Sequence, residues 1–132
     1  MTIKQNGGVF GRNPKFKEVE TERLFFTSTA TSPELSISSG EITVSQSYAR
    51  VDTEASASTD DLDTINGGKI GQLLILRPRN SARTVVVKDQ TGNLDINGDF
   101  TMNHGRDCIV LLCVDEGGTI DFVELARSDN NS

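Results

Sequence analysis

Few residues of this chain have the chemistry that catalysis needs. The 132 residues include one histidine, His104, which lies in the turn-like segment MNHG (102–105). A histidine-rich zinc site and a histidine-based metalloprotease motif each need a second histidine and are excluded. A serine or cysteine paired with His104 needs only to meet it in space, but the Gly-x-Ser-x-Gly elbow of one hydrolase class is absent. We therefore predict no catalytic residues and no enzyme activity.

Two acidic clusters have the composition of calcium ligands. Residues 60–63 (DDLD) precede an Asn-Gly pair, and residues 95–99 (DINGD) place Asp95, Asn97 and Asp99 at alternate positions. The second cluster has Phe100 where a calcium-binding loop requires Gly, and Arg106 where the loop requires a bidentate Glu. We interpret both clusters as solvated turns, and we expect neither a metal nor another cofactor.

A basic cluster formed by Arg77, Arg79 and Arg83 stands out in an otherwise acidic region. Three interpretations are open: exposed hairpin ends, ion pairs with carboxylates of another subunit, and a site for an acidic ligand such as a glycan or a lipopolysaccharide phosphate. The first two together are favoured. The three arginines therefore form a possible second contact patch.

The two cysteines predict a reducing environment. Cys108 and Cys113 are five residues apart in one apolar run, so a strand would point them to opposite faces and leave them unbonded. Free thiols are typical of folding in a cytoplasm. With no apolar run long enough to span a membrane, no membrane partner is expected.

Composition and charge suggest a protein that associates with copies of itself. Hydrophobic residues make up 35% of the chain, which favours a modest core or one completed by a neighbouring subunit. The net charge of −6 argues against direct nucleic-acid binding. Residues 1–23 carry more basic than acidic groups, so this basic segment would suit docking to an acidic body.

The amino-terminal segment is predicted to be an extended arm, residues 1–23. Residues 1–20 follow neither strand nor helix periodicity, yet four of the six phenylalanines occur at or before position 26. Such side chains are expected to fill pockets on another chain, although folding back onto the same domain is the alternative. The predicted partner-binding residues are Val9, Phe10, Arg12, Phe16 and Lys17.

Residues 24–132 are predicted to form one all-β domain. Short apolar runs recur between turn residues, at 71–78, 83–89, 94–96, 99–102, 107–114 and 119–126. The Asn97-Gly98 pair predicts a hairpin, and residues 41–54 predict a strand pair with a register shift near Tyr48. No repeat of a whole unit is visible. These features favour an antiparallel β-sandwich, a jelly roll or a small barrel.

The segment 62–130, with its pattern TINGG, TVVVKDQTGN, GDFT and ELARSDN, resembles a domain of tailed-bacteriophage virion proteins. The opening GGVFGRNPKFKEVE (7–20) is similar to the start of phage fibre and decoration proteins. The resemblance implies a trimeric β-sandwich or jelly-roll module at a particle surface, made in the host cytoplasm.

Two structural roles follow from this resemblance. The first is a capsid decoration, or cement, protein that binds the major capsid protein and stabilises the head shell, with the arm as its anchor. The second is a short tail-fibre, spike or adaptor module that contacts the host surface. An arm followed by one domain favours the first role, because fibres are long and repetitive.

Overall fold

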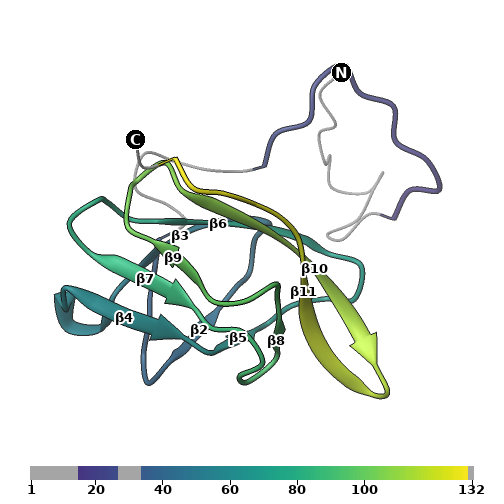
Figure 1. Ribbon diagram of the computed structural model, residues 1–132. Helices are drawn as coiled ribbons and strands as arrows, with labels where there is room; N and C mark the ends of the chain where they lie inside the picture. The colour runs from purple at the N-terminus through teal and green to yellow at the C-terminus, as the bar shows by residue number, and fades with distance from the viewer. Residues whose placement is uncertain (1–14, 27–33, 131–132) are drawn as a thin grey trace.

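The computed structural model describes residues 15–26 and 34–130, and the described part of the chain is all-β, as predicted (Figure 1). Its regular elements are eleven strands and one short 3-10 turn. They are β1 (Glu34–Ser36), β2 (Glu41–Thr43), β3 (Tyr48–Asp52), the turn η1 (Glu54–Ser56), β4 (Thr59–Leu62), β5 (Thr64–Asn66), β6 (Leu73–Pro78), β7 (Thr84–Val87), β8 (Leu94–Asp95), β9 (Phe100–Met102), β10 (Cys108–Glu116) and β11 (Thr119–Ser128).

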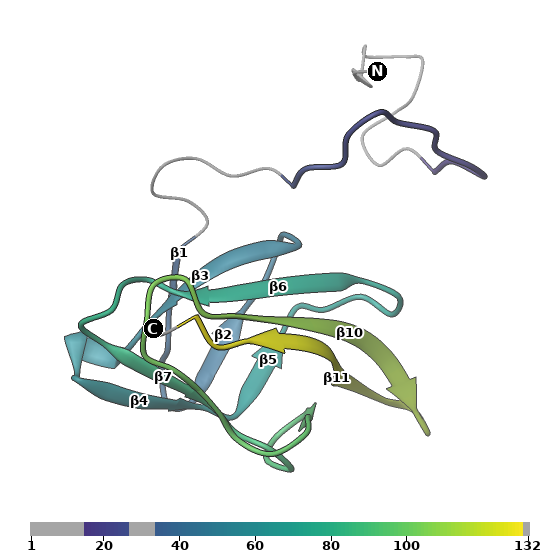
Figure 2. The ribbon, with the colours of Figure 1, turned by 45° about the horizontal axis from the view of Figure 1, so that its top comes forward.

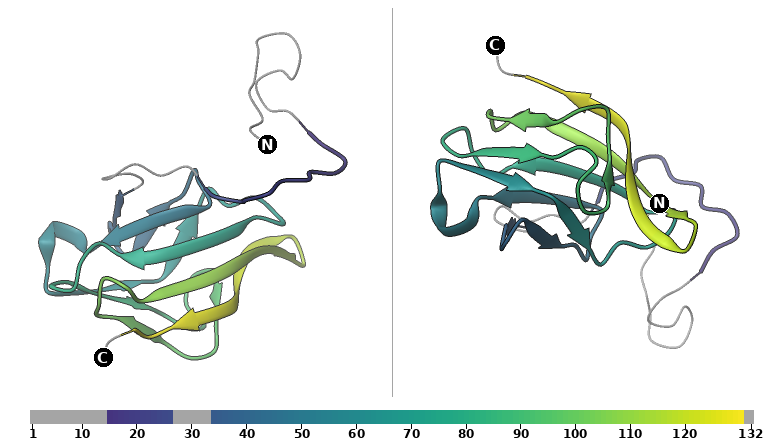
Figure 3. Two further views of the ribbon diagram at one scale, coloured as in Figure 1. Left: turned by 90° about the horizontal axis from the view of Figure 1, so that it is seen from above. Right: turned by 60° about the horizontal axis from the view of Figure 1, so that its bottom comes forward.

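The strands form three sheets around a single core, and the chain visits the sheets in a repeating order. The six-stranded sheet has the order β1-β3-β6-β10-β11-β8, the two-stranded sheet pairs β2 with β5, and the three-stranded sheet has the order β4-β7-β9. A first turn of chain therefore runs through β2, β3 and β4, and a second turn through β5, β6 and β7 (Figure 3).

The second turn is stacked on the first, strand on parallel strand. Ile42 pairs with Ile65, Ala49 with Leu76, and Asp60 with Val85. Equivalent positions thus lie roughly 25 residues apart, within the range of solenoid repeats. The body is a short solenoid-like stack of two turns.

This stacking corrects the predicted antiparallel sandwich or jelly roll. Five of the eight strand pairings in the described part of the chain are parallel. Short strands separated by turns fit either arrangement, because strand length and side-chain alternation do not encode the sheet to which a strand belongs. From β1 to β9 the corners between strands direct each strand to a new sheet, so strands that follow one another in this part of the chain do not pair.

After β7 the chain reverses direction and closes the stack. β9 pairs antiparallel with β7, and β10 pairs antiparallel with β6. β10 and β11 then form a hairpin, with a register shift between Val110 and Leu111. Both long strands therefore belong to the six-stranded sheet, which they extend beyond the two parallel turns.

Two local predictions were wrong because each assumed that consecutive strands pair with one another. Asn97-Gly98 does form a turn, with Gly98 at φ +81°, but β8 pairs with β11 and β9 with β7, so no hairpin results. Residues 41–54 contain two strands as expected, yet β2 and β3 lie in different sheets. The register shift expected near Tyr48 is a corner between sheets.

The core lies between the three sheets and receives residues from both turns. Leu74, Leu76 and Leu111 come from the six-stranded sheet, Ile65 from the two-stranded sheet and Val85 from the three-stranded sheet, and all are essentially inaccessible to water. The aromatic rings in this core are those of Phe100 and Phe122. Mostly aliphatic packing explains how a chain with few aromatic residues fills its interior.

Two glycines allow the turns to stack closely. Gly67 has φ +84° at the corner after β5, and a Cβ atom there would overlap the carbonyl oxygen of Val44. Gly92 has φ +54°, and a Cβ atom there would overlap the carbonyl oxygen of Asp63. Glycine is required at both corners because backbone of the neighbouring segment occupies the space of a side chain.

The described stretch 15–26 contains no strand or helix. Figures 1 and 2 both place it on the side of the body that the six-stranded sheet forms. Among the described residues, no helix has the length and apolar character to cross a bilayer.

Candidate functional site

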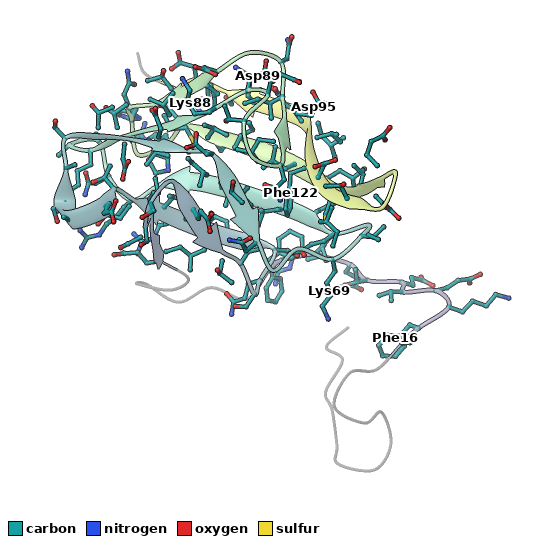
Figure 4. All side chains as sticks on the ribbon, turned by 90° about the horizontal axis from the view of Figure 1, so that it is seen from below. Phe16, Lys69, Lys88, Asp89, Asp95 and Phe122 are labelled. Carbon is teal, nitrogen blue, oxygen red and sulfur yellow. The ribbon has the colours of Figure 1, made fainter. Side chains whose placement is uncertain are left out.

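The stretch 15–26, here called the arm segment, presents apolar side chains to solvent. Exposed fractions are 42% for Phe16, 58% for Val19, 75% for Leu24 and 81% for Phe25. Figure 4 shows Phe16 projecting away from the β-body. Exposure of several large apolar groups on one short segment is typical of a protein interaction site.

The predicted partner-binding residues are only partly covered by the structure. Phe16 and Lys17 belong to the arm segment, and both are exposed. Val9, Phe10 and Arg12 lie outside the described residues. The predicted partner-binding set did not include Leu24 or Phe25, although Phe25 is one of the four early phenylalanines on which the prediction of an arm rests.

The outward side of the six-stranded sheet, here called the outer face, is a second apolar surface. Strand pairing places its side chains in two neighbouring rows across the sheet. One row contains Tyr48, Ile75, Val110 and Ala126, and the next contains Leu73, Leu112 and Val123. The inner face of the same sheet packs on the other two sheets, so the sheet is apolar on both sides.

The outer face has a signal in the sequence that the predictions above missed. The run CIVLLCV (108–114) has no polar residue at either strand parity, whereas a strand with one solvated face alternates apolar with polar residues. Val110, Leu112 and Val114 point outward and are half-buried, while Ile109, Leu111 and Cys113 are buried in the core. A run that is apolar at both parities indicates a strand covered on both faces.

Opposite charges mark the two ends of the outer face. At the hairpin end, Asp121 of β11 pairs with Val114 of β10, and Glu116 lies two positions after Val114 on β10. At the other end, Arg50 pairs with Arg77. Asp121 and Glu116 make no ion pair within ranges 15–26 and 34–130. The acidic end therefore has charge available for a partner.

The predicted second contact patch is largely engaged within the chain. The buried carboxylate of Asp52 accepts hydrogen bonds from Arg83 (2.5 Å) and Arg79 (3.4 Å). Arg79 also contacts Glu34 at 2.9 Å, and Glu34 contacts Arg50 at 3.2 Å. Of the three interpretations, pairing with carboxylates describes this cluster, but the carboxylates belong to the same chain.

Arg77 is held separately from that network. Its guanidinium donates to the carbonyl oxygen of Gly105 and, at 3.2 Å, to the hydroxyl of Tyr48. These bonds join β3 and β6 to the loop before β10. Arg77, Arg79 and Arg83 thus stabilise the body, and replacing them would disturb folding as well as any surface contact.

His104 belongs to a tight turn organised by Asp107. The buried carboxylate of Asp107 accepts the backbone N–H groups of Asn103, His104 and Asn130 at 3.0, 2.9 and 2.7 Å. The His104 ring accepts the N–H of Arg106 through Nδ1 at 3.2 Å. These bonds assign His104 a structural part in the turn.

The acidic clusters are organised around backbone N–H groups and a lysine. Asp60 accepts the N–H groups of Glu54 and Asp61 at 2.6 and 3.0 Å. The backbone N–H of Asp89, with the neighbouring Lys88 ammonium, holds the pKa of Asp99 below its usual value. In the described part of the chain, no three His, Cys, Asp or Glu residues are grouped so that they could hold a metal ion.

One ion pair fastens the loop after β8 to β11. Arg127 contacts Glu124 at 2.6 Å and also donates to the carbonyl oxygens of Asn97 and Gly98. Its guanidinium lies 4.9 Å from the ring centre of Phe100. The hydrogen bond from Arg127 lowers the pKa of Glu124, although burial opposes this shift. The pair therefore favours the charged form of the carboxylate.

The two thiols are free and point to opposite faces, as predicted. Cys113 is buried in the core, whereas Cys108 lies half-buried on the outward side of β10. Burial raises the pKa of the Cys113 thiol, with the Asp121 carboxylate as a lesser cause. Cys113 is thus an unreactive core thiol.

A groove lies at the corner where the chain passes from the two-stranded to the six-stranded sheet. Its walls are the segments 44–47 and 67–72, and the side chain of Gln72 donates to the Gln46 carbonyl oxygen at 3.2 Å. The Gln46 Oε1 atom is buried without a hydrogen-bond partner among the described residues. Ile70 is exposed at the rim, so the groove adds apolar surface beside the Leu73 row.

Comparison with known proteins gives no assignment. No protein-family model matches the chain, and no curated protein matches its sequence. The arm segment and the outer face are therefore the candidate functional surfaces on the basis of their own chemistry.

Proposed function

We propose that this protein is a non-enzymatic structural component of a tailed-bacteriophage particle, with capsid decoration as its role. In this role it assembles with copies of itself, with a trimer expected, and binds the major capsid protein on the outside of the head. The protein is made in the host cytoplasm and acts on the assembled virion.

The observation that carries the proposal is that two apolar surfaces face solvent in a single copy. Leu24 and Phe25 on the arm segment are the most exposed large apolar residues, and the outer face carries two apolar rows. Apolar area of this kind is typical of a subunit that is completed by its neighbours. The resemblance of residues 62–130 to phage virion proteins supplies the particle context.

Binding to a shell stabilises it by mass action. A protein that binds the assembled head but not its separated subunits shifts the equilibrium toward assembly, and many copies multiply the effect. The described stretch 15–26 contains no strand or helix, and an anchor of this kind can bind a partner without unpairing a sheet of the body. Within ranges 15–26 and 34–130, the first strand is β1, which begins at Glu34.

The test uses purified protein and expanded phage heads that lack it. We expect the full chain to saturate the heads and a chain lacking residues 1–20 to keep the circular dichroism of the parent but to lose head binding. The matched control is the full chain with Asn103→Ser, an exposed substitution on the body. Equal occupancy of heads by the truncated protein would remove the anchor from the proposal.

A tail-fibre, spike or adaptor role is the competing proposal, and copy number separates the two. Decoration requires hundreds of copies in each particle, whereas a tail module requires about a dozen. Quantitative mass spectrometry of purified particles gives the ratio to the major capsid protein. Charge reversal at Arg83 would be a poor test of host binding, because it would place a carboxylate beside the buried Asp52.

A further inference from the structure

The outer face is an apolar surface on a sheet whose other side is already packed. The inner side of the six-stranded sheet forms the core together with the two smaller sheets. On the outward side, β10 nevertheless carries Val110, Leu112 and Val114, and Leu73 in the neighbouring strand is 41% exposed. A sheet that is apolar on both sides is normally covered on both sides.

One end of the outer face is basic. Arg50 and Arg77 pair across β3 and β6, and Arg79 follows directly after β6. The carboxylate of Glu34 on β1 contacts both Arg50 and Arg79. Arg77 makes no ion pair among the described residues, because its guanidinium bonds to neutral oxygen atoms. This end of the face therefore keeps a positive charge that its own chain does not neutralise.

The opposite end of the outer face, at the hairpin between β10 and β11, is acidic. Glu116 and Asp121 lie at outward positions there, and Asp115 beside them is exposed. The neighbouring basic residue is Lys69, in the corner that bonds to β10. Three acidic residues against one lysine leave this end negative.

A closed ring of copies can join the two ends. If the symmetry axis runs across the strands, parallel to the sheet, the basic end of each copy meets the acidic end of the next. Arg77 is on β6 and Glu116 is on the adjacent strand β10, so their offset along this axis is about 5 Å, one strand spacing. Two long side chains span that offset. An axis along the strands would bring like charges together instead.

The length of the face limits how many copies close the ring. From Cys108 to Val114 along β10 the face spans roughly 20 Å. In a triangle with sides of this length, each side lies about 6 Å from the centre, close to the half-spacing of about 5 Å between packed sheets. In a square the distance rises to about 10 Å, too far for the side chains of valine and leucine to meet. The apolar rows therefore fill the centre of a three-membered ring and leave a void in a larger one.

We infer that three copies associate through their outer faces around an axis that runs across the strands, with Glu116 of each copy beside Arg77 of the next. The occupant of the face is thus further copies of this chain. The inference rests on the trimer of the proposed function and names the surface that forms it. Each chain enters its body at β1, an edge strand of the sheet, so the three chains enter at one end of the axis.

The native Cys108 provides a direct test in the full-length protein. In a Val114→Cys variant, mild oxidation is expected to join Cys108 of one copy to the introduced thiol of the next, because both lie on β10 at opposite ends of the face. Within one chain the two thiols are roughly 20 Å apart along the strand and cannot bond. Each copy carries one thiol for each neighbour, so a closed ring gives a covalent trimer on a non-reducing gel.

Two controls accompany the gel. Adding Cys108→Ala should abolish the covalent trimer, because Cys113 is buried and points to the core. Thr101→Cys places an exposed thiol on the three-stranded sheet and is expected to give no trimer through Cys108.

A second measurement tests the face without cross-linking. Leu112→Lys puts a charge in the middle of the outer face, and sedimentation of the full chain is expected to shift from the mass of a trimer to that of a monomer. Thr101→Lys makes the same change on the three-stranded sheet and should leave the trimer intact. Circular dichroism reports whether both variants are folded, and the gel with Val114→Cys decides the question if Leu112→Lys is not.

Three outcomes would overturn the inference. They are the absence of any disulfide between copies in Val114→Cys, a covalent product that ends at the dimer, and a trimer that persists in folded Leu112→Lys. A dimer would mean that two faces pack flat on one another around a two-fold axis. If any of the three occurs while removal of residues 1–20 still abolishes head binding, the proposed function stands on the anchor. If the covalent trimer forms but the full chain does not occupy heads, the inference stands and the decoration role fails.

Discussion

At the scale of single residues, one asparagine completes a sheet that has only two strands. Asn93 accepts the N–H of Ile65 at 2.9 Å and donates to the carbonyl oxygen of Ile65 at 2.8 Å. It also donates to the carbonyl oxygen of Ile120 at 3.2 Å. The side-chain amide therefore bonds to β5 as a third strand would, at the place where the chain reverses direction.

Replacing Asn93 by Asp keeps the acceptor oxygen and removes both donations. We expect the free energy of unfolding to fall by about 1–3 kcal/mol, because two backbone carbonyl groups lose their partner and face a carboxylate. Urea denaturation at neutral pH measures the change. Asn103→Asp is the matched control, and its exposed side chain should give a change within about 0.5 kcal/mol. Equal stability of the two variants would contradict the strand-like role of Asn93.

At the scale of elements, Arg127 holds the loop between β8 and β9 against β11. It bonds to Glu124 on its own strand and to the loop carbonyl groups of Asn97 and Gly98. Glu124 accepts the N–H of Asn97 at 2.8 Å, so the carboxylate and the guanidinium are both hydrogen-bonded to the backbone of the loop. The attachment depends on the charge of Glu124.

Acid should weaken this attachment. The pKa of Glu124 is lowered in the folded state by the hydrogen bond from Arg127, so the folded protein binds fewer protons than the unfolded chain. The resulting stability is present above the ordinary glutamate pKa of 4.5 and is lost as the pH falls through the folded value. We expect the thermal midpoint to fall on acidification below about pH 4.5, and more steeply than in Glu124→Gln.

The control for the acid experiment is Glu116→Gln. Glu116 makes no ion pair among the residues that the structure describes, so its acid profile should run parallel to that of the parent. A profile for Glu124→Gln that is as steep as the parent's would show that other carboxylates carry the acid sensitivity.

Strand content was predictable from the sequence, but sheet membership was not. The valine-rich run at 84–87 and the apolar run at 108–114 are strands because β-branched and apolar residues fit a pleated, half-buried surface. In contrast, β4 has the sequence TDDL, and the composition of its first residues is that of a loop. It is a strand because β7 pairs with it in parallel, and only Leu62 of the four is fully buried.

The internal repeat was missed because the two turns follow the same backbone course but have different residues at most equivalent positions. Leu62 in the first turn occupies the position of Val87 in the second, and Ile42 occupies that of Ile65. Outward positions differ freely, as Asp61 and Val86 do. The candidate site was predictable in part: the arm segment followed from its phenylalanines, whereas the outer face became visible only when strand pairing aligned its rows.

At the scale of the whole molecule, the two turns and the closing strands share one core. Val51 from the first turn, Leu76 from the second and Leu111 from the closing hairpin are all fully buried in the same cluster. A repeat protein with many units can unfold in parts, because each unit contacts only its neighbours. Here the second turn pairs with both the first turn and the closing strands, and all three contribute to one core.

We therefore expect the body to unfold in one cooperative step. Leu111→Ala should lower the free energy of unfolding by about 2–5 kcal/mol, because the cavity affects both turns. The fluorescence of Tyr48, the only tyrosine, and the far-ultraviolet circular dichroism should change at the same urea concentration. The control is Ile70→Ala at an exposed position, where a small change is expected. Two separate transitions in Leu111→Ala would show that the turns fold independently.

The reversal of the chain after β7 has a consequence for how such a body can change in size. Both ends of the stack are built once, by β1 with β2 at one end and by β9, β10 and Asn93 at the other. Between these two ends, the segment from Leu62 to Thr64 connects the first turn of chain to the second. Duplication of one complete turn of chain at this connection would lengthen the body and leave both of its ends unchanged. An insertion of any other length would shift the inserted strands out of register with the strands of the adjacent turn.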